Sequence, residues 1–281
     1  MPIRPFEQVD VFTQVPFKGN PLAVVLDAQG LSDAAMQEFA QWTQLSETTF
    51  VLPPTPQGLA KGADYRVRIF TPGMELPFAG HPTLGTAVAW LNHGGQPCQP
   101  GRLVQECGVG NISLLQLHGR WAFAAPTLQR HVPSPELLAP ILAALGLPAA
   151  SVLAAQHLDN GPHWLGLLLN DVATVLDLTP DHARLKTLGV KVGVAARRAE
   201  DQLEVRAFAA PAGIQEDPVT GSLNASLAQW LTADGWMPST YVARQGSALG
   251  RNGLVYLSCD AQQQVWVAGD VVRCVQGSVA L

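Results

Sequence analysis

Apolar and polar residues alternate over several short segments of the chain, which is the pattern of half-buried β-strands. In residues 65–70, Tyr65, Val67 and Ile69 occupy one face and two arginines occupy the other. Similar alternation, or a short apolar run bounded by Gly or Pro turns, predicts seven more strands. These strands cover residues 6–13, 22–26, 48–52, 164–169, 203–208, 254–258 and 265–267.

Helical periodicity is confined to fewer segments. Ser32 is a suitable N-cap for a helix whose apolar face includes Met36 and Phe39. A Ser-Pro-Glu sequence at residues 134–136 predicts a second helix start. Apolar residues spaced by three or four positions predict two further helices, beginning near residues 84 and 223. Because strands outnumber helices and no regular βαβ alternation appears, we expect an α+β fold rather than a doubly wound sheet.

A short internal repeat marks the start of these last two helices. Residues 80–86 (GHPTLGT) resemble residues 216–222 (EDPVTGS), and an offset of 136 residues separates His81 from Asp217. An Arg-x-Phe sequence precedes each copy at nearly the same distance. The repeat indicates either a duplication or a chance match between two short motifs.

The repeat also predicts two helix ends that are suited to bind an anion. Each copy has a proline in the expected first helical turn, where its missing N–H is not needed. The amides at Gly85 and Thr86, and those at Gly221 and Ser222, are expected at the helix amino ends, where the macrodipole favours a carboxylate. The alternative interpretation is two capped helices that bind no ligand.

The composition narrows the class of protein. A chain of 281 residues with 47% hydrophobic residues forms one large or two modest domains. Its net charge of −5 argues against a nucleic-acid partner. No continuous apolar helix reaches the roughly 20 residues of a membrane span, and the amino terminus lacks a secretory signal. We therefore expect a cytoplasmic protein with no membrane partner.

The cysteines and histidines form no metal or cofactor motif. The four cysteines include no CxxC pair, and the histidines show neither HxH nor HExxH spacing. Cys107 precedes a Gly-Val-Gly sequence that lacks the third glycine of a dinucleotide-binding loop, so a buried, unreactive thiol is expected there. The sequence predicts no metal and no cofactor.

Six short motifs occur in order along the chain. They are residues 9–13 (VDVFT), 19–25 (GNPLAVV), 45–50 (LSETTF), 68–72 (RIFTP), 80–85 (GHPTLG) and 216–222 (EDPVTGS). Together they resemble the phenazine-biosynthesis PhzF-like isomerases, a family similar in fold to diaminopimelate epimerase. The resemblance covers most of the chain and is weakest over residues 96–203.

The resemblance implies two pseudo-symmetric α+β domains, each a strongly curved, mostly antiparallel sheet wrapped around a central helix. The expected domains are residues 1–117 with residues 268–281, and residues 118–267. The helices at the two copies of the repeat would be the central ones, and the active site would lie in a cleft between the domains. The family resemblance also implies a homodimer.

The resemblance implies roles for individual residues. Glu47 matches the general acid/base, and His81 and Asp217 match polar residues that line the same pocket. The residues expected to bind the substrate are Ser46, Thr71, Gly73, Gly80, Gly85, Thr86, Gly221 and Ser222. Pro82 replaces the usual alanine, and residues 223–224 (LN) replace a frequent Ala-His pair. The epimerase branch uses two cysteines as bases, and no cysteine stands in either motif here, which disfavours a two-thiol racemase.

A single carboxylate can move a proton between two carbons by acting first as a base and then as an acid. For this role Glu47 is expected in a partly desolvated pocket that raises its pKa, whereas the alternative is an exposed loop carboxylate. The alternative for His81 and Asp217 is helix capping. We therefore expect a cofactor-independent isomerase or epimerase that acts on a small carboxylate-bearing metabolite. The alternative function is a non-catalytic protein that binds a carboxylate ligand in the same cleft.

Overall fold

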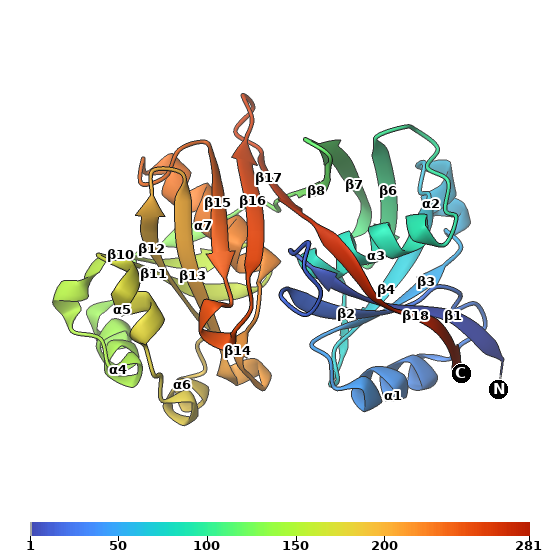
Figure 1. Cartoon of the computed structure of the whole chain (residues 1–281). Coiled ribbons are helices and arrows are strands. Elements are labelled where there is room, and N and C mark those ends of the chain that lie inside the picture. Colours follow the sequence, from blue (N-terminus) through green and yellow to red (C-terminus); the bar gives the residue numbers. More distant parts are fainter. Residues whose placement is uncertain (1) are drawn as a thin grey trace. The chain divides into compact units, whose positions relative to one another are not determined.

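The chain folds as two units in the computed structural model, which describes residues 2–281 (Figure 1). The first unit runs to Ala124 and resumes over Ala268–Leu281, and the second unit is Ala125–Val267. The boundary at residues 267–268 coincides with the expected one. The other boundary follows residue 124 instead of residue 117, because the strand at residues 120–124 pairs within the sheet of the first unit.

The first unit contains nine strands and three helices among the described residues. In chain order they are β1 (Ile3–Val11), β2 (Asn20–Val25), α1 (Asp33–Thr43), β3 (Thr48–Leu52), α2 (Pro56–Ala60), β4 (Tyr65–Phe70), β5 (Glu75–Leu76), α3 (Gly80–Asn92), β6 (Arg102–Cys107), β7 (Gly110–Leu117), β8 (Arg120–Ala124) and β18 (Val271–Ala280).

The second unit contains the remaining strands and helices. They are β9 (Gln129–His131), α4 (Pro135–Leu145), β10 (Val152–Asp159), β11 (His163–Leu169), α5 (Val172–Asp177), α6 (His182–Leu188), β12 (Val192–Ala199), β13 (Gln202–Ala209), β14 (Ile214–Asp217), α7 (Gly221–Ala233), β15 (Thr240–Gln245), β16 (Gly253–Cys259) and β17 (Val265–Gly269), which leads back into the first unit. Strands predominate and most pairings are antiparallel, so the fold is of the α+β kind that the sequence predicts.

The strands of each unit pair in the same succession. In the first unit β1 is antiparallel to β2, β2 is parallel to β3, β3 is antiparallel to β4, and β4 is parallel to β6. In the second unit β10 is antiparallel to β11, β11 is parallel to β12, β12 is antiparallel to β13, and β13 is parallel to β15. The short strands β5 and β14 pair with β4 and β13, and β6 and β15 continue antiparallel into β7 and β16.

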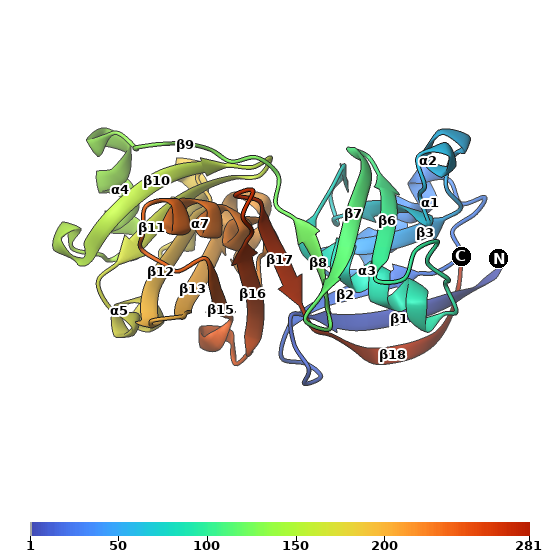
Figure 2. The ribbon, with the colours of Figure 1, turned by 90° about the horizontal axis from the view of Figure 1, so that it is seen from above.

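One long, buried helix lies against the strands of each unit (Figure 2). In the first unit α3 contacts β1, β2, β3, β6, β8 and β18, and in the second unit α7 contacts β10 and β16. Nine of the 13 residues of each helix are buried. A helix that is buried on most sides needs small or apolar residues around its circumference, which explains the weak amphipathic pattern of both segments.

The elements predicted from the residue pattern are confirmed. Every predicted strand is present, and α1 begins after Ser32, whose hydroxyl accepts a hydrogen bond from the Ala35 amide at 3.2 Å. The repeat predicts a proline in the first turn of each helix, and this prediction is confirmed for one copy only. Pro82 lies in the first turn of α3, but Pro218 lies in the turn that precedes α7, because β14 extends to Asp217 and α7 begins only at Gly221.

Close packing of α3 against the sheet makes one glycine in that helix necessary. A Cβ atom built on Gly85 would lie 2.6 Å from Leu22 Cδ2, 2.9 Å from Val11 Cγ2 and 3.1 Å from Val9 Cγ2. All three neighbouring side chains are fully buried, so none has free space to move into.

We expect Gly85→Ala to lower the free energy of unfolding. Overpacking of a core costs about 1–3 kcal/mol, which exceeds the roughly 1 kcal/mol that alanine contributes to helix propensity over glycine. Denaturant unfolding of the variant measures the difference. Gly73→Ala is the control, because nothing lies within 4 Å of its Cβ position and the change should stay within about 0.5 kcal/mol. Equal stability of the two variants would contradict this account of Gly85.

Candidate active site

The amino ends of α3 and α7 differ from those of the other helices. Among the seven α-helices in residues 2–281, five have an N-cap side chain that accepts a hydrogen bond from the first turn. Their caps are Ser32, Thr55, Ser134, Asp171 and Asp181. The N-cap residues of α3 and α7 are Ala79 and Thr220, and neither side chain caps its helix. A helix end without a side-chain cap leaves its first amides to other partners, and an anion is a suitable one.

Glu47 lies in the turn between α1 and β3, and His81 is the second residue of α3. Their side chains meet: His81 Nε2 lies 3.5 Å from Glu47 Oε2, and the side chains are only 6% and 16% exposed. Strand β3, which follows Glu47, is tied to α3, which carries His81, because the Thr49 hydroxyl accepts a hydrogen bond from Thr86 of α3 at 2.9 Å. The hydroxyls of Thr48 and Thr43, the latter at the end of α1, also form a hydrogen bond, with 3.0 Å between their oxygens.

Burial changes the acidity of Glu47. Removal of the carboxylate from water disfavours its charged form and raises the pKa of Glu47 from 4.5 to about 6. The Ser46 hydroxyl opposes this shift. Glu47 is therefore not the exposed loop carboxylate of the alternative interpretation, and its pKa lies where a side chain can both accept and release a proton near neutral pH.

The other predicted residues of the first unit have different surroundings. The Thr71 hydroxyl accepts hydrogen bonds from the amides of Gly73 and Met74 at 3.2 and 3.0 Å, so these residues form a partly exposed turn before β5. Gly80 is buried and is the first residue of α3.

The expectation that Gly85 and Thr86 supply amides at a helix end is wrong. Because α3 begins at Gly80 and the Thr83 amide already bonds to the Ala79 carbonyl, both residues lie in the second turn. There Gly85 packs against the sheet and the Thr86 hydroxyl binds Thr49.

In the second unit Asp217 ends β14 and lies just before α7. Its Oδ2 accepts a hydrogen bond from the Thr220 hydroxyl at 2.6 Å, and Thr220, not Asp217, is the N-cap residue of the helix. The buried Gln245 side chain organises this turn: it donates to the Asp217 carbonyl and to Thr220 Oγ1, and it accepts from the Thr220 amide and from Asn224. Asn224, one of the two departures from the family pattern, therefore has a structural role in this chain.

Gly221 and Ser222 are the first two residues of α7, as predicted. The helix offers their amides no acceptor, since its first backbone bond joins the Asn224 amide to the Thr220 carbonyl. Ser222 is held by two buried side chains that the sequence analysis did not single out. Asn160 donates to its carbonyl at 3.0 Å, and the Trp164 indole donates to its hydroxyl at 3.2 Å. A Gly-Pro turn between two apolar strands (residues 161–162) was the available sign of a hairpin there.

The structure thus brings the predicted residues together in two groups, one in each unit. Glu47, Ser46 and His81 form the first group, and Asp217, Gly221 and Ser222 form the second. Each group contains the start of a buried helix that lacks a side-chain cap. That the two groups serve one substrate stays a prediction.

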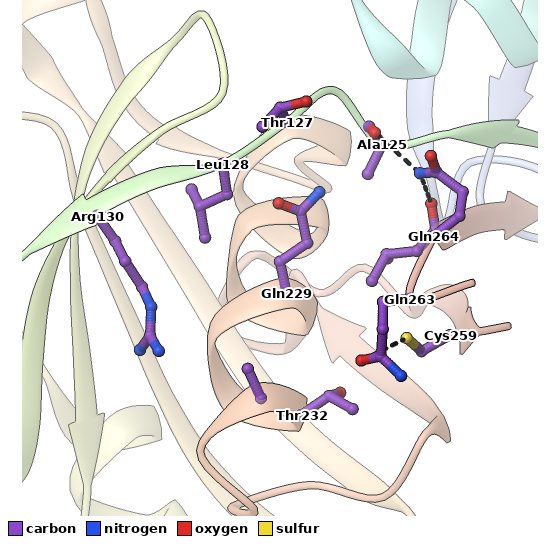
Figure 3. A pocket seen from close by; sticks show the side chains of 11 residues that line it. Ala125, Thr127, Leu128, Arg130, Gln229, Thr232, Cys259, Gln263 and Gln264 are labelled. Atoms are coloured by element: carbon purple, nitrogen blue, oxygen red, sulfur yellow. Dashed lines mark hydrogen bonds between the residues drawn. The ribbon is translucent and has the colours of Figure 1, made fainter. Parts of the chain in front are cut away.

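A hollow of about 320 Å³ in the second unit contains none of these residues (Figure 3). Neutral amide and hydroxyl groups line much of it, including those of Gln229, Thr232 and Gln263. Arg130 also lines it, but its guanidinium makes two hydrogen bonds to Asp234. Burial raises the pKa of the Cys259 thiol, which disfavours a reactive thiolate. The hollow therefore lacks a group that is poised for proton transfer, unlike the Glu47 site.

Comparison with known proteins identifies the family. The family model for phenazine biosynthesis-like proteins matches residues 9–277. A trans-2,3-dihydro-3-hydroxyanthranilate isomerase of Pseudomonas aeruginosa is 35% identical over 278 residues, which cover 96% of this chain and 93% of that protein. Antisense-enhancing sequence 1 of Schizosaccharomyces pombe is 34% identical over 291 residues and 97% of each protein. The chain belongs to the phenazine biosynthesis-like family.

The fold agrees with this membership. The crystal structure of a PhzF-family phenazine biosynthesis protein from Bacillus anthracis superposes with a TM-score of 0.85 over 100% of both chains, at 24% identity. Relatives that align with nearly the whole chain are named isomerases, and this member of the family is accordingly an isomerase. Within residues 2–281, no helix is long and apolar enough to span a bilayer, and no three His, Cys, Asp or Glu side chains gather as metal ligands.

The raised pKa of Glu47 predicts a pH-dependent contribution to stability. The folded-state pKa exceeds the unfolded value, so the proton is bound more tightly by the folded protein. This stabilisation is complete below about pH 4.5 and is lost as the pH rises through about 6. Above pH 6 the buried charge lowers the free energy of unfolding by about 2 kcal/mol.

We therefore expect Glu47→Gln to become more stable relative to the unmodified protein between pH 4.5 and pH 8, by up to about 2 kcal/mol. Denaturant unfolding at both pH values measures this change. The matched control is Glu38→Gln on the exposed side of α1, for which the difference from the unmodified protein should not depend on pH. A pH-independent difference for Glu47→Gln would refute the buried-carboxylate account.

Proposed function

We propose that this family member is a cofactor-independent isomerase that moves a proton between two carbons of a small carboxylate-bearing metabolite, with Glu47 as the acid/base. The observation that carries the proposal is the burial of the Glu47 carboxylate beside His81, with a pKa of about 6. A metabolite similar to trans-2,3-dihydro-3-hydroxyanthranilate is the proposed substrate, because that compound gives the Pseudomonas aeruginosa relative its name.

In the proposed reaction one carboxylate acts twice. The Glu47 carboxylate removes a proton from a substrate carbon, so that a C–H bond breaks, an O–H bond forms and the electron pair stays on the substrate. The same O–H then returns the proton to a second carbon on the same face, and Glu47 ends the cycle ionised. His81 Nε2, 3.5 Å from Oε2, is proposed to position the carboxylate.

Substrate binding is proposed for the helix ends. The amides of Gly221 and Ser222 have no acceptor within α7, and the macrodipole adds a partial positive charge to them. These amides would hold the substrate carboxylate, as the family resemblance implies. Gly80 is proposed to contribute at the start of α3, whereas Gly85 and Thr86 are not part of this proposal.

We further propose that the two units arose by duplication. The shared succession of strand pairings supports this origin. An arginine with equivalent contacts in each unit supports it as well. Arg68 makes two hydrogen bonds to Glu75, and its Cζ lies 5.1 Å from the Phe70 ring centre. Arg206, likewise, makes two to Glu216 and lies 5.0 Å from the ring centre of its own Phe208.

Incubation in heavy water tests the function. With trans-2,3-dihydro-3-hydroxyanthranilate as the probe, we expect the unmodified protein to form an isomer, detected by NMR. Mass spectrometry then shows solvent deuterium in that fraction of the isomer for which the Glu47 O–H exchanged with heavy water before it returned the proton. Glu47→Gln should lower the rate of isomer formation at least 100-fold, because it removes the only proposed proton carrier. Glu38→Gln should keep the full rate. A bound but unlabelled and unchanged compound would instead indicate the alternative, a carboxylate-binding protein without turnover.

A further inference from the structure

We infer that Trp164 and Lys191 are positioning residues that make the start of α7 selective for an anionic substrate group. This inference rests on the proposed function, because it concerns the helix end that is proposed to hold the substrate carboxylate. It adds two residues from β11 and the segment before β12, neither of which belongs to the motifs that carry the family resemblance.

The first step concerns the direction of one hydrogen bond. The Trp164 indole N–H can only donate, and it lies 3.2 Å from Ser222 Oγ. Ser222 must therefore act as the acceptor in this contact, and its own hydroxyl proton remains available for another partner. Because the Trp164 side chain is 4% exposed, it holds this geometry within the packed interior. The contact thus leaves the Ser222 hydroxyl to donate a hydrogen bond beside the amides of Gly221 and Ser222, which have no acceptor within α7.

The second step concerns charge. The Asp217 carboxylate lies just before the same helix end and on its own would repel a substrate carboxylate. Lys191 offsets this charge: its ammonium nitrogen lies 4.9 Å from the centre of the Trp164 ring, and it interacts electrostatically with Asp217. Burial lowers the pKa of Lys191, and the Asp217 charge opposes this shift.

The third step concerns how Lys191 is held. Its backbone carbonyl accepts a hydrogen bond from the Leu165 amide at 2.8 Å, which attaches the segment before β12 to β11 next to Trp164. Arg206 cannot replace Lys191 as the cation, because its guanidinium is engaged by Glu216 and by the carbonyls of Val175, Leu176 and Leu178.

The test compares an anionic probe with a neutral probe of the same shape, benzoate and benzamide, titrated into the full chain and followed by NMR. We expect the unmodified protein to bind benzoate more tightly than benzamide. Trp164→Phe keeps the ring beneath Lys191 but removes the N–H, and it should weaken benzoate binding about tenfold with little effect on benzamide. Lys191→Met should reduce the same preference, and Lys191→Arg should restore most of it.

A matched control and a double variant separate positioning from general damage. Trp266 donates through its indole N–H to Asp260 at 2.9 Å elsewhere in the second unit, so Trp266→Phe should leave benzoate binding unchanged. If Trp164 acts through Ser222, adding Trp164→Phe to Ser222→Ala should cause little further loss.

The outcomes also distinguish this inference from the proposed function. Equal binding of benzoate and benzamide by the unmodified protein would overturn the inference, as would equal effects of Trp164→Phe and Trp266→Phe. If Trp164→Phe does not fold, the Lys191 variants still test the inference: an unchanged preference for benzoate in Lys191→Met would overturn it. A protein that prefers benzoate as expected but forms no isomer of trans-2,3-dihydro-3-hydroxyanthranilate would refute the role of Glu47 and leave the present inference standing.

Discussion

The buried amino ends of α3 and α7 are the constraint on which the rest of the structure depends. A buried backbone N–H without an acceptor is costly, and a helix start presents several of them at once. Five other helices meet this requirement with a side-chain cap. Thr220 is of a type that caps helices well, but its hydroxyl is engaged by Asp217 and Gln245. A bound anion is the partner that would satisfy the remaining amides of α7 and benefit from its dipole.

Buried polar side chains hold both helix starts in place. In the first unit Gln105 of β6 donates to Thr83 of α3 at 3.0 Å, and in the second unit Gln245 of β15 accepts from Asn224 of α7 at 2.8 Å. Both glutamines are fully buried, so an unmade bond would leave a desolvated amide. In the low-dielectric interior these bonds are stronger than in water and fix the atoms that they join. The position of each helix end is therefore set by the sheet rather than by flexible loops.

The sequence predicts much of the fold but only part of the site. Strand β4 follows directly from alternation, β3 follows from a short run closed by two prolines, and the caps Ser32 and Ser134 give the starts of α1 and α4, because these signals are local. The start of α3 does not follow from the repeat: the motif aligns Gly85 with Gly221, yet packing of α3 against β1 and β2 makes Gly85 an interior residue. Long-range contacts, such as the one between Trp164 and Ser222, depend on which strands become neighbours and have no local pattern. Glu47 was found through a family motif, and its burial beside His81 could be established only from the folded chain.

The environment of Glu47 favours catalysis over simple binding. A protein that only bound a carboxylate ligand would gain nothing from a glutamate carboxylate that is buried near neutral pH, because its negative charge destabilises the folded state. A proton carrier needs this arrangement, since the desolvation that raises its pKa also makes the ionised form a stronger base. His81 limits the cost without removing it, because at 3.5 Å the pair is not the short, two-point contact that Arg206 makes with Glu216. A stronger partner at position 81 would hold the carboxylate ionised and prevent it from carrying a proton.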